Sequence, residues 1–476
     1  MIKDTMSKKI ISIFTLVMIN LAAIGSIRNW PTIAETGFSS IFFFLLAALI
    51  FFLPTALVAA ELATGWPKIG GIFIWVKEAF GHRLGFLAIW LLWIENVIWY
   101  PTILTFIATT VAYIFDPSWG QNKTYLILSS LAAFWILTWV NMKGMKISGW
   151  ISSFGVVVGS FIPAAVIIFM GFTWYFSGKP LQIDFSWDSF IPNMSSPEQW
   201  VIFTGVLFSL CGMEMSAIHA RDVQNPQRNY PRAMVYTILL VMIPSILGVL
   251  SIASVVPQGD ISLTGGTMQA FVLFVDSYNL HMLIPVMALL VFCGAVASLS
   301  TWIVGPSRGL LAAAQHGDLP PKFRQLNSHG MPGNLLITQA WIVTVLSLLF
   351  VLMPSINSAY WILTVLVAQV YLIMYIIMFA AAIKLRYSHS KVKRSYKIPG
   401  GNYGMWITAG LGILSSFFVF IIGFFPPAQI PTGNVSFYVA FLAIGVVLIC
   451  LAPALILKFK KPAWTQRLSH ETGEDE

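Results

Sequence analysis

Long apolar runs, separated by short polar segments, dominate this chain. Each run is continuous rather than alternating and, at 1.5 Å per residue, is long enough to cross a hydrocarbon layer of about 30 Å as a helix. Strands of a membrane β-barrel would instead alternate over about ten residues. The pattern predicts an all-α polytopic membrane protein with twelve transmembrane helices, at 10–30, 38–62, 84–114, 124–141, 151–176, 198–220, 233–256, 282–312, 335–353, 358–384, 403–425 and 435–457.

Composition supports the membrane assignment. Hydrophobic residues make up 58% of the 476 residues and charged residues only 9%, with a mean hydropathy of +0.81, whereas soluble domains carry roughly a quarter charged residues. This excludes a set of soluble domains and a disordered chain. Cys211, Cys293 and Cys450 lie in separate runs, so we expect no disulfide, no metal centre and no cofactor.

The net charge of +9 is informative through its distribution. With both termini in the cytoplasm, only Lys123 and Lys179 of the 27 basic residues fall outside and Arg28 falls at membrane depth. Such asymmetry is the positive-inside pattern and indicates no nucleic-acid partner. We expect a cytoplasmic segment 1–9, a cytoplasmic loop 385–402 and a tail 458–476, all too short to form a domain. Function is therefore expected within the membrane region.

Two apolar runs are interrupted near their middle. Residues 20–31 read NLAAIGSIRNWP, and residues 208–219 read FSLCGMEMSAIH. The first and sixth runs begin two halves of five helices each, and interruptions at corresponding positions are typical of a transporter site. A broken helix exposes free N–H groups, which attract a carboxylate, and free C=O groups, which attract an ammonium. Together they suit a zwitterion such as an α-amino acid, although small residues also serve simple helix packing.

Several motifs resemble the amino acid–polyamine–organocation transporter superfamily, and within it the bacterial glutamate/γ-aminobutyrate antiporters. They are NWPTIAETGFS (29–39), AAELATGWPKIGGIFIWV (59–76), GMEMSAIHARDVQNPQRNYPRAM (212–234), TWIVGPSRGL (301–310) and YKIPGG (396–401). The resemblance implies a LeuT-like core of two inverted five-helix repeats over 10–384, with helices 11 and 12 over 403–457. It also implies a bacterial cytoplasmic (inner) membrane.

The resemblance also implies where substrate binds. The unwound stretch of helix one corresponds to Ala23, Ile24, Gly25 and Ser26, whose N–H groups would hold the substrate carboxylate. The unwound stretch of helix six corresponds to Cys211, Gly212, Met213 and Glu214, whose carbonyls would face the amine. The glutamate antiporter has a C-terminal segment that closes its cytoplasmic mouth at neutral pH. This chain ends soon after its last span, so we do not expect acid gating.

Ionisable residues within a span are functional candidates because they are costly there. Glu61 is expected to pair with a cytoplasmic base such as Lys68 or Arg83. Arg28 and Glu95 would neutralise each other, or Arg28 would select an acidic substrate side chain, or Glu95 and Glu214 would favour a cationic one. Ser298 and Trp302 in helix eight are candidate side-chain contacts. Further aromatic residues are expected to flank the cavity or the membrane interfaces: Trp30, Trp93, Trp99, Tyr100, Tyr360 and Trp361. In helix ten, Thr364, Gln369 and Tyr371 are candidates to line the path.

We therefore predict a secondary amino acid transporter, an antiporter of the glutamate/γ-aminobutyrate type working by alternating access. The expected partners are an amino acid, its counter-substrate or protons, and the lipid bilayer, with the chain as a monomer or homodimer. A proton-coupled amino acid permease and a permease for cationic amino acids or amines remain alternatives. The sequence lacks the motifs of a membrane enzyme and the repeated filter of a channel.

Overall fold

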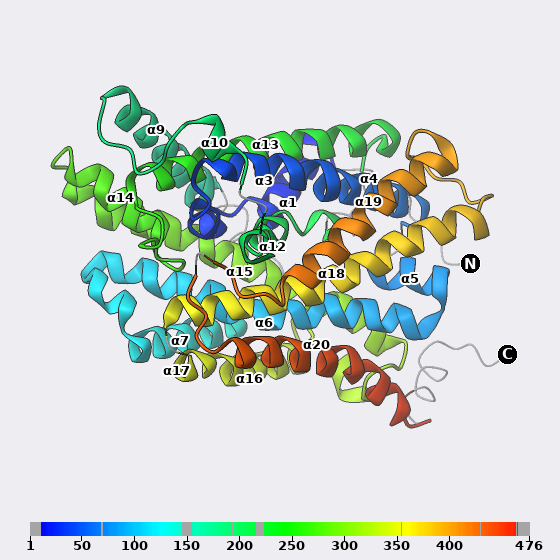
Figure 1. Cartoon of the computed structure of the whole chain (residues 1–476). Helices are drawn as coiled ribbons and strands as arrows, with labels where there is room; N and C mark the ends of the chain where they lie inside the picture. The colour runs from blue at the N-terminus through cyan, green and yellow to red at the C-terminus, as the bar shows by residue number, and fades with distance from the viewer. Residues whose placement is uncertain are drawn as a thin grey trace.

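The computed structural model shows a bundle of helices lying side by side (Figure 1). It describes residues 11–67, 70–144, 155, 157–192, 195, 197–215, 223–353, 355–428, 430–462 and 464. The expected segment 1–9 and most of the expected tail lie outside these described residues. Within them the only strand-like pairing is a single parallel bridge between Ile11 and Val223, so the predicted all-α class is confirmed.

The α-helices follow one another along the whole chain. They are α1 (Ile13–Ile24), α2 (Trp30–Ala34), α3 (Ser40–Ala47), α4 (Leu53–Gly65), α5 (Ile72–Phe80), α6 (His82–Phe115), α7 (Lys123–Met142), α9 (Ile162–Phe176), α10 (Trp187–Phe190), α11 (Pro197–Trp200), α12 (Ile202–Ser209), α13 (Pro226–Val255), α14 (Gly266–Asp276), α15 (Ile284–Gln315), α16 (Gly333–Ser347), α17 (Leu349–Leu352), α18 (Ile356–Ser388), α19 (Gly401–Ile422) and α20 (Val435–Lys458). Short 3-10 or π segments join some of them, among them η1 (Ile27–Asn29), η3 (Ala48–Phe52) and η5 (Val157–Phe161).

Nine helical segments of the described residues are long and apolar enough to span a membrane. The chain is thus an integral membrane protein, as expected. Three of the twelve expected spans appear instead as shorter helices. The run 10–30 divides into α1, η1 and α2, the run 335–353 divides into α16 and α17, and the helix of the run 198–220 stops at Ser209. The twelve-helix count and the inverted repeat therefore stay predictions.

Two long helices form the centre of the bundle. In α6 and α18 the most apolar stretch is 83% buried, whereas in α20 it is only 17% buried. Helix α6 packs against α15, α18 and α5, and α20 lies at the edge of the bundle in Figure 1. The central position explains why the cores of α6 and α18 are apolar around their whole circumference, which is the pattern of a buried helix.

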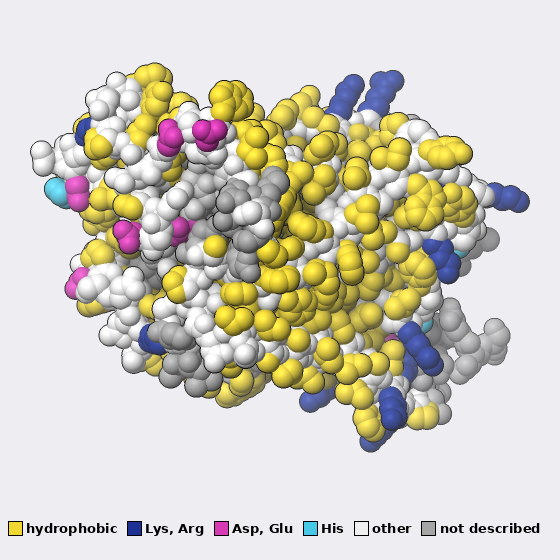
Figure 2. Space-filling view, in the orientation of Figure 1, with side chains coloured by type: hydrophobic (Ala, Val, Ile, Leu, Met, Phe, Trp, Pro, Cys, Tyr) yellow, Lys and Arg dark blue, Asp and Glu magenta, His cyan; other side chains and the backbone are white. Residues whose placement is uncertain are grey.

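Charged side chains gather at the two ends of the molecule. On the face in Figure 2, most basic side chains lie at the right-hand end, most acidic ones lie at the left-hand end, and an apolar belt separates them. This separation of charges in space corresponds to the charge asymmetry in the sequence. The apolar belt between the two ends has the character of a lipid-facing surface.

A buried acid ties elements together at the basic end. Glu61, at the end of α4, forms ion pairs with Arg386 at 2.7 Å and Arg394 at 3.4 Å and accepts the N–H of Ile398 at 2.8 Å. The expectation that Glu61 pairs with a base is confirmed, and the bases in the described residues are Arg386 and Arg394. Lys68 lies outside the described residues, and Arg83 is not among the bases that the structure places at Glu61. The two arginines belong to α18 and its following loop, which the chain brings to α4 from more than 300 residues away.

Candidate functional site

The first interruption lies between α1 and η1. Helix α1 ends at Ile24, and the Gly25 N–H still donates to the Leu21 carbonyl at 2.8 Å. The chain then becomes extended at Ser26, whose Oγ accepts the N–H of Arg28 at 3.3 Å and so caps η1, as Ser commonly does at a helix start. The non-helical stretch is therefore Gly25–Ser26, and Ala23 and Ile24 are the last helical residues rather than part of it.

The second interruption follows α12, which ends at Ser209. Gly212 has φ +118°, a conformation that side chains with a Cβ rarely adopt, and its N–H donates to the Tyr375 hydroxyl at 2.8 Å. A 3-10 turn covers 213–215, and 216–222 lie outside the described residues. A Cβ built on Gly212 would lie 3.4 Å from Ile24 and from Trp302, so the two interruptions meet in space.

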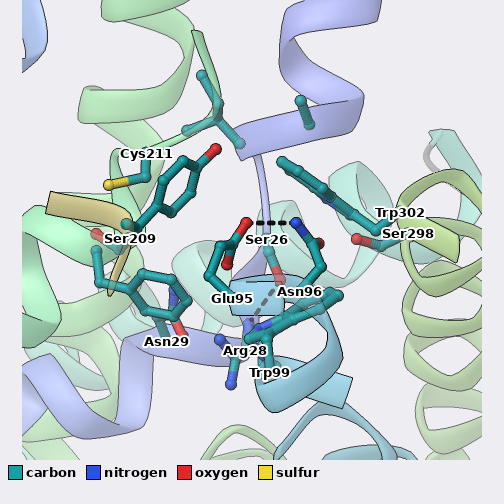
Figure 3. A pocket seen from close by; sticks show the side chains of 14 residues that line it. Ser26, Arg28, Asn29, Glu95, Asn96, Trp99, Ser209, Cys211, Ser298 and Trp302 are labelled. Atoms are coloured by element: carbon teal, nitrogen blue, oxygen red, sulfur yellow. Dashed lines mark hydrogen bonds between the residues drawn. The ribbon is translucent and has the colours of Figure 1, made fainter. Parts of the chain in front are cut away.

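A cavity of about 50 Å³ lies where the two interruptions meet (Figure 3). It has room for a few water molecules, so a substrate would widen it. Eight of the twelve predicted binding residues line it, together with six others. The lining residues are Ala23, Ile24, Ser26, Arg28, Asn29, Glu95, Asn96, Trp99, Phe208, Ser209, Cys211, Ser298, Trp302 and Tyr371.

The remaining predicted residues lie close by without lining this cavity. Gly25 lines a smaller cavity of about 10 Å³ that shares Ser26, Arg28 and Ser298 with the first. Gly212, Met213 and Glu214 are buried but are absent from both cavity walls.

Four lining residues were not predicted from the sequence: Asn29, Asn96, Phe208 and Ser209. The sequence position of Asn96 could have identified it as a lining residue, because an amide next to Glu95 in the middle of an apolar run also needs polar surroundings. Ser209 and Phe208 had a weaker signal, since they only precede the second interruption. Asn29 follows Arg28 directly, and its position could be inferred only from the course of the chain after the first interruption.

Glu95 occupies the centre of the cavity in Figure 3 and comes from the middle of α6. Its Oε1 accepts a hydrogen bond from the Asn96 side chain, and the same Asn96 nitrogen also donates to the Leu92 carbonyl at 2.9 Å. Only 2% of Glu95 is exposed. The carboxyl group of Glu95 is therefore a buried acceptor that a neutral amide holds at the cavity wall.

Arg28 makes contacts other than the expected ion pair with Glu95. Its Nη1 donates to the Thr102 hydroxyl at 3.2 Å and to the Tyr360 hydroxyl at 2.5 Å. Its Cζ lies 5.4 Å from the centre of the Trp99 ring and 5.5 Å from that of the Tyr360 ring, within the range of cation–π attraction. The expectation that Arg28 and Glu95 neutralise each other is wrong, because each side chain is held by neutral groups.

Glu214 is held by two tyrosines of α18. Its two carboxyl oxygens accept hydrogen bonds from Tyr371 and Tyr375, each at 2.5 Å. Because the Tyr375 hydroxyl also accepts the Gly212 N–H, this network connects the second interruption to α18. Tyr371 lines the cavity while Glu214 stands behind it. The geometry favours a bracing role for Glu214 over direct contact with a substrate.

Trp302 and Ser298 bring α15 to the cavity. The Trp302 ring packs edge-on against Trp99 with 6.2 Å between ring centres, and its carbonyl accepts the Tyr100 hydroxyl at 2.8 Å. Ser298 lies one helical turn away and lines both cavities. Helices α6, α15 and α18 therefore surround the two interruptions with aromatic and hydroxyl groups.

Comparison with known proteins identifies the family of the chain. A family model described as amino acid permease matches residues 11–449. An uncharacterised transporter of Legionella pneumophila is 47% identical over 95% of this chain and 97% of its own length. A glutamate/gamma-aminobutyrate antiporter of Lactococcus lactis is 33% identical over 99% and 93%. A probable agmatine/putrescine antiporter of the same species is 22% identical over 83% and 84%. The chain belongs to the amino acid permease family of transporters.

Proposed function

We propose that the protein is an amino acid antiporter of the glutamate/γ-aminobutyrate type, located in a bacterial inner membrane with both termini in the cytoplasm. One observation carries this proposal: the same buried cavity is lined by residues from both helix interruptions and by Arg28 and Glu95. Such a cavity offers groups of both signs to a small zwitterion. The similarity to the glutamate/gamma-aminobutyrate antiporter over 99% of the chain supports the same substrate class.

The two interruptions would divide the recognition of the substrate backbone. At the end of α12 the carbonyls of 209–211 follow the last helical turn, and such carbonyls carry the negative end of the helix dipole. They suit the ammonium group, with Glu95 in the wall of the same cavity. At the first interruption the N–H groups of Gly25, Ser26 and Arg28 would bind a carboxylate after leaving their present acceptors, which are the Leu21 and Ile24 carbonyls and the Ser26 Oγ. Rocking of the helices around this fixed site would then expose it to each side in turn.

A second candidate is exchange of a cationic amino acid or amine. The buried carboxyl of Glu95 favours it, and so does the similarity to the probable agmatine/putrescine antiporter. The identity to that relative is lower, and the cavity also holds the buried cation of Arg28, which repels a second cation.

Counterflow in proteoliposomes tests both candidates. Vesicles loaded with unlabelled glutamate should accumulate labelled glutamate and labelled γ-aminobutyrate, and vesicles without internal substrate should accumulate little. Accumulation of agmatine or arginine in place of the two acids would favour the second candidate. Uptake that needs an imposed proton gradient but no internal substrate would identify a proton-coupled permease instead.

A further inference from the structure

Arg28 is a buried cation whose charge has no acidic partner among the residues that the structure describes. Only 2% of its surface is exposed. None of the ion pairs within the described part of the chain includes it. The two acids of the site form hydrogen bonds with other side chains: Glu95 accepts one from an asparagine, and Glu214 accepts two from tyrosines. An uncompensated charge in a buried position is costly, so this cation fits a site in which the ligand supplies the anion.

The guanidinium is also held in one orientation. Both of its side-chain hydrogen bonds leave from Nη1, one to Thr102 on α6 and one to Tyr360 on α18. An arginine has five N–H donors in a fixed fork. In Arg28, Nη2 and Nε donate to no protein group within the described residues, so these donors remain available. The rings of Trp99 and Tyr360 flank the guanidinium. The free edge of the fork remains for a carboxylate, which binds such an edge through two parallel bonds.

We propose that Arg28 binds the side-chain carboxylate of the substrate, and that Thr102 and Tyr360 are positioning residues that aim its guanidinium. This deepens the proposed function and rests on it. Glutamate carries two carboxylates and one ammonium, and γ-aminobutyrate is glutamate without its α-carboxylate. A site that binds the distal carboxylate and the ammonium therefore accepts both substrates. The two differ only in the α-carboxylate, which such a site does not need to bind.

Glutamine is the discriminating substrate. It has the shape of glutamate and the same α-groups, but its distal group is a neutral amide. If Arg28 binds the distal carboxylate, changes at Arg28 affect glutamate and γ-aminobutyrate together and leave glutamine largely unchanged. If Arg28 binds the α-carboxylate, they affect glutamate and glutamine equally. If Arg28 only supports the fold, all three substrates lose transport in parallel.

The test measures KM for the three substrates by counterflow in Thr102→Val, Tyr360→Phe and Arg28→Gln proteins. Loss of one hydrogen bond to the guanidinium should raise the KM for glutamate and γ-aminobutyrate about tenfold, and loss of Arg28 should raise it about a hundredfold. The KM for glutamine should change less than about twofold. Arg28→Lys should restore only part of the affinity, because a lysine lacks the planar fork.

Two matched variants serve as controls. Thr105 lies on α6 one turn from Thr102, is equally buried, and donates only to the Pro101 carbonyl of its own helix. Tyr438 on α20 is fully buried and its hydroxyl donates to the Gly423 carbonyl at 2.9 Å, away from both cavities. Thr105→Val and Tyr438→Phe should keep the ratio of KM for glutamine to KM for glutamate.

The outcomes separate the two proposals. Wild-type protein that exchanges neither glutamate nor γ-aminobutyrate overturns the proposed function, and this inference with it. Wild-type protein that exchanges both, while Thr102→Val and Tyr360→Phe leave the ratio of KM values unchanged, overturns the role of Arg28 alone. If Arg28→Gln protein does not fold, the two milder variants decide, and thermal stabilisation of each by added glutamate measures binding without transport.

Discussion

At the residue scale, the two interruptions depend on glycine for different reasons. Gly212 has a positive φ of +118°, so a side chain there is strained whatever space surrounds it. Gly25 has φ −74°, which any residue adopts, but a Cβ there would lie 2.7 Å from the Leu21 carbonyl oxygen. That oxygen is the acceptor of the Gly25 N–H. A side chain at Gly25 would therefore displace the last turn of α1 from the cavity.

Replacement of Gly25 by leucine should consequently abolish substrate binding. A displacement of about 1 Å in a site can lower turnover about a hundredfold, and the Gly25→Ala protein should fall between the leucine variant and wild type. Gly410→Leu on α19 is the control, because a Cβ at that position meets nothing within 4 Å. The measurement is counterflow at matched protein amounts. Normal exchange by the Gly25→Leu protein would show that the site lies elsewhere.

Glu35 should give the protein a pH-dependent stability. This residue follows α2, outside the nine candidate spans, and its Oε2 accepts the Gly259 N–H at 2.8 Å. Burial raises the pKa of Glu35 to about 7 from its ordinary value of 4.5, with the Gly259 N–H opposing the rise and nearby Asp260 adding to it. The folded protein therefore keeps this proton at pH values where the unfolded chain has lost it.

The sign of the effect follows from this difference in proton binding. Stability should fall as pH rises from about 4.5, and the fall should level off above about pH 7, where Glu35 ionises in the folded protein too. Thermal unfolding in detergent should show the wild-type midpoint falling by several degrees over this window. Glu35→Gln protein should lack that part of the fall, and identical curves for the two proteins would contradict the assignment.

At the element scale, the sequence was sufficient where the signal is local. Continuous apolar runs identified α6, α15 and α18, and the interruptions predicted at 23–26 and 211–214 lie close to where α1 and α12 end. The partner of Glu61 could not be predicted, because Arg386 lies 325 residues away in the chain and several bases compete at the same membrane face. The Arg28 environment was missed for a related reason, since hydroxyl groups such as Thr102 are common in apolar helices.

The ion pairs of Glu61 should hold the end of α18 and the following loop against α4. Removing one partner of a buried pair costs about 3–5 kcal/mol, and Glu61→Gln would leave Arg386 and Arg394 without their acid. We expect lower thermal stability and faster proteolysis within 389–400. Asp276→Asn breaks an exposed pair with His281, where 62% of the histidine side chain and 45% of the aspartate side chain are accessible, and should cost less than about 1 kcal/mol. Equal effects would show that the Glu61 pairs are not structural.

At the scale of the whole molecule, the distribution of charges along the sequence agrees with their positions in the folded bundle. The positive-inside pattern assigns the loops to sides, and on the face in Figure 2 most basic side chains lie at one end and most acidic ones at the other. The cavity with Arg28 lies in the part of the bundle formed by α6, α15 and α18. Because Arg28 is buried there, its charge is shielded from both aqueous sides, which is the property of a closed state in the proposed alternating-access mechanism.

Orientation in the membrane can be tested with single cysteines in a variant that lacks the three native ones. Asp188→Cys lies in the expected external loop 178–197 and Lys391→Cys in the expected cytoplasmic loop 385–402, and both native side chains are exposed. A membrane-impermeant maleimide should label the first in intact cells and the second only after lysis. This pattern requires an odd number of spans between the two positions, and five are expected there.

The other labelling patterns each contradict a different part of the topology. If only Lys391→Cys reacts in intact cells, the number of intervening spans is still odd, but the whole chain is inverted and the positive-inside assignment is wrong. If both positions react in intact cells, or neither does before lysis, an even number of spans separates them. One of the five expected helices would then fail to cross. The first candidates are the two shortest, α12 with 8 residues and α16 with 15 residues, which at 1.5 Å per residue are about 12 Å and about 23 Å long.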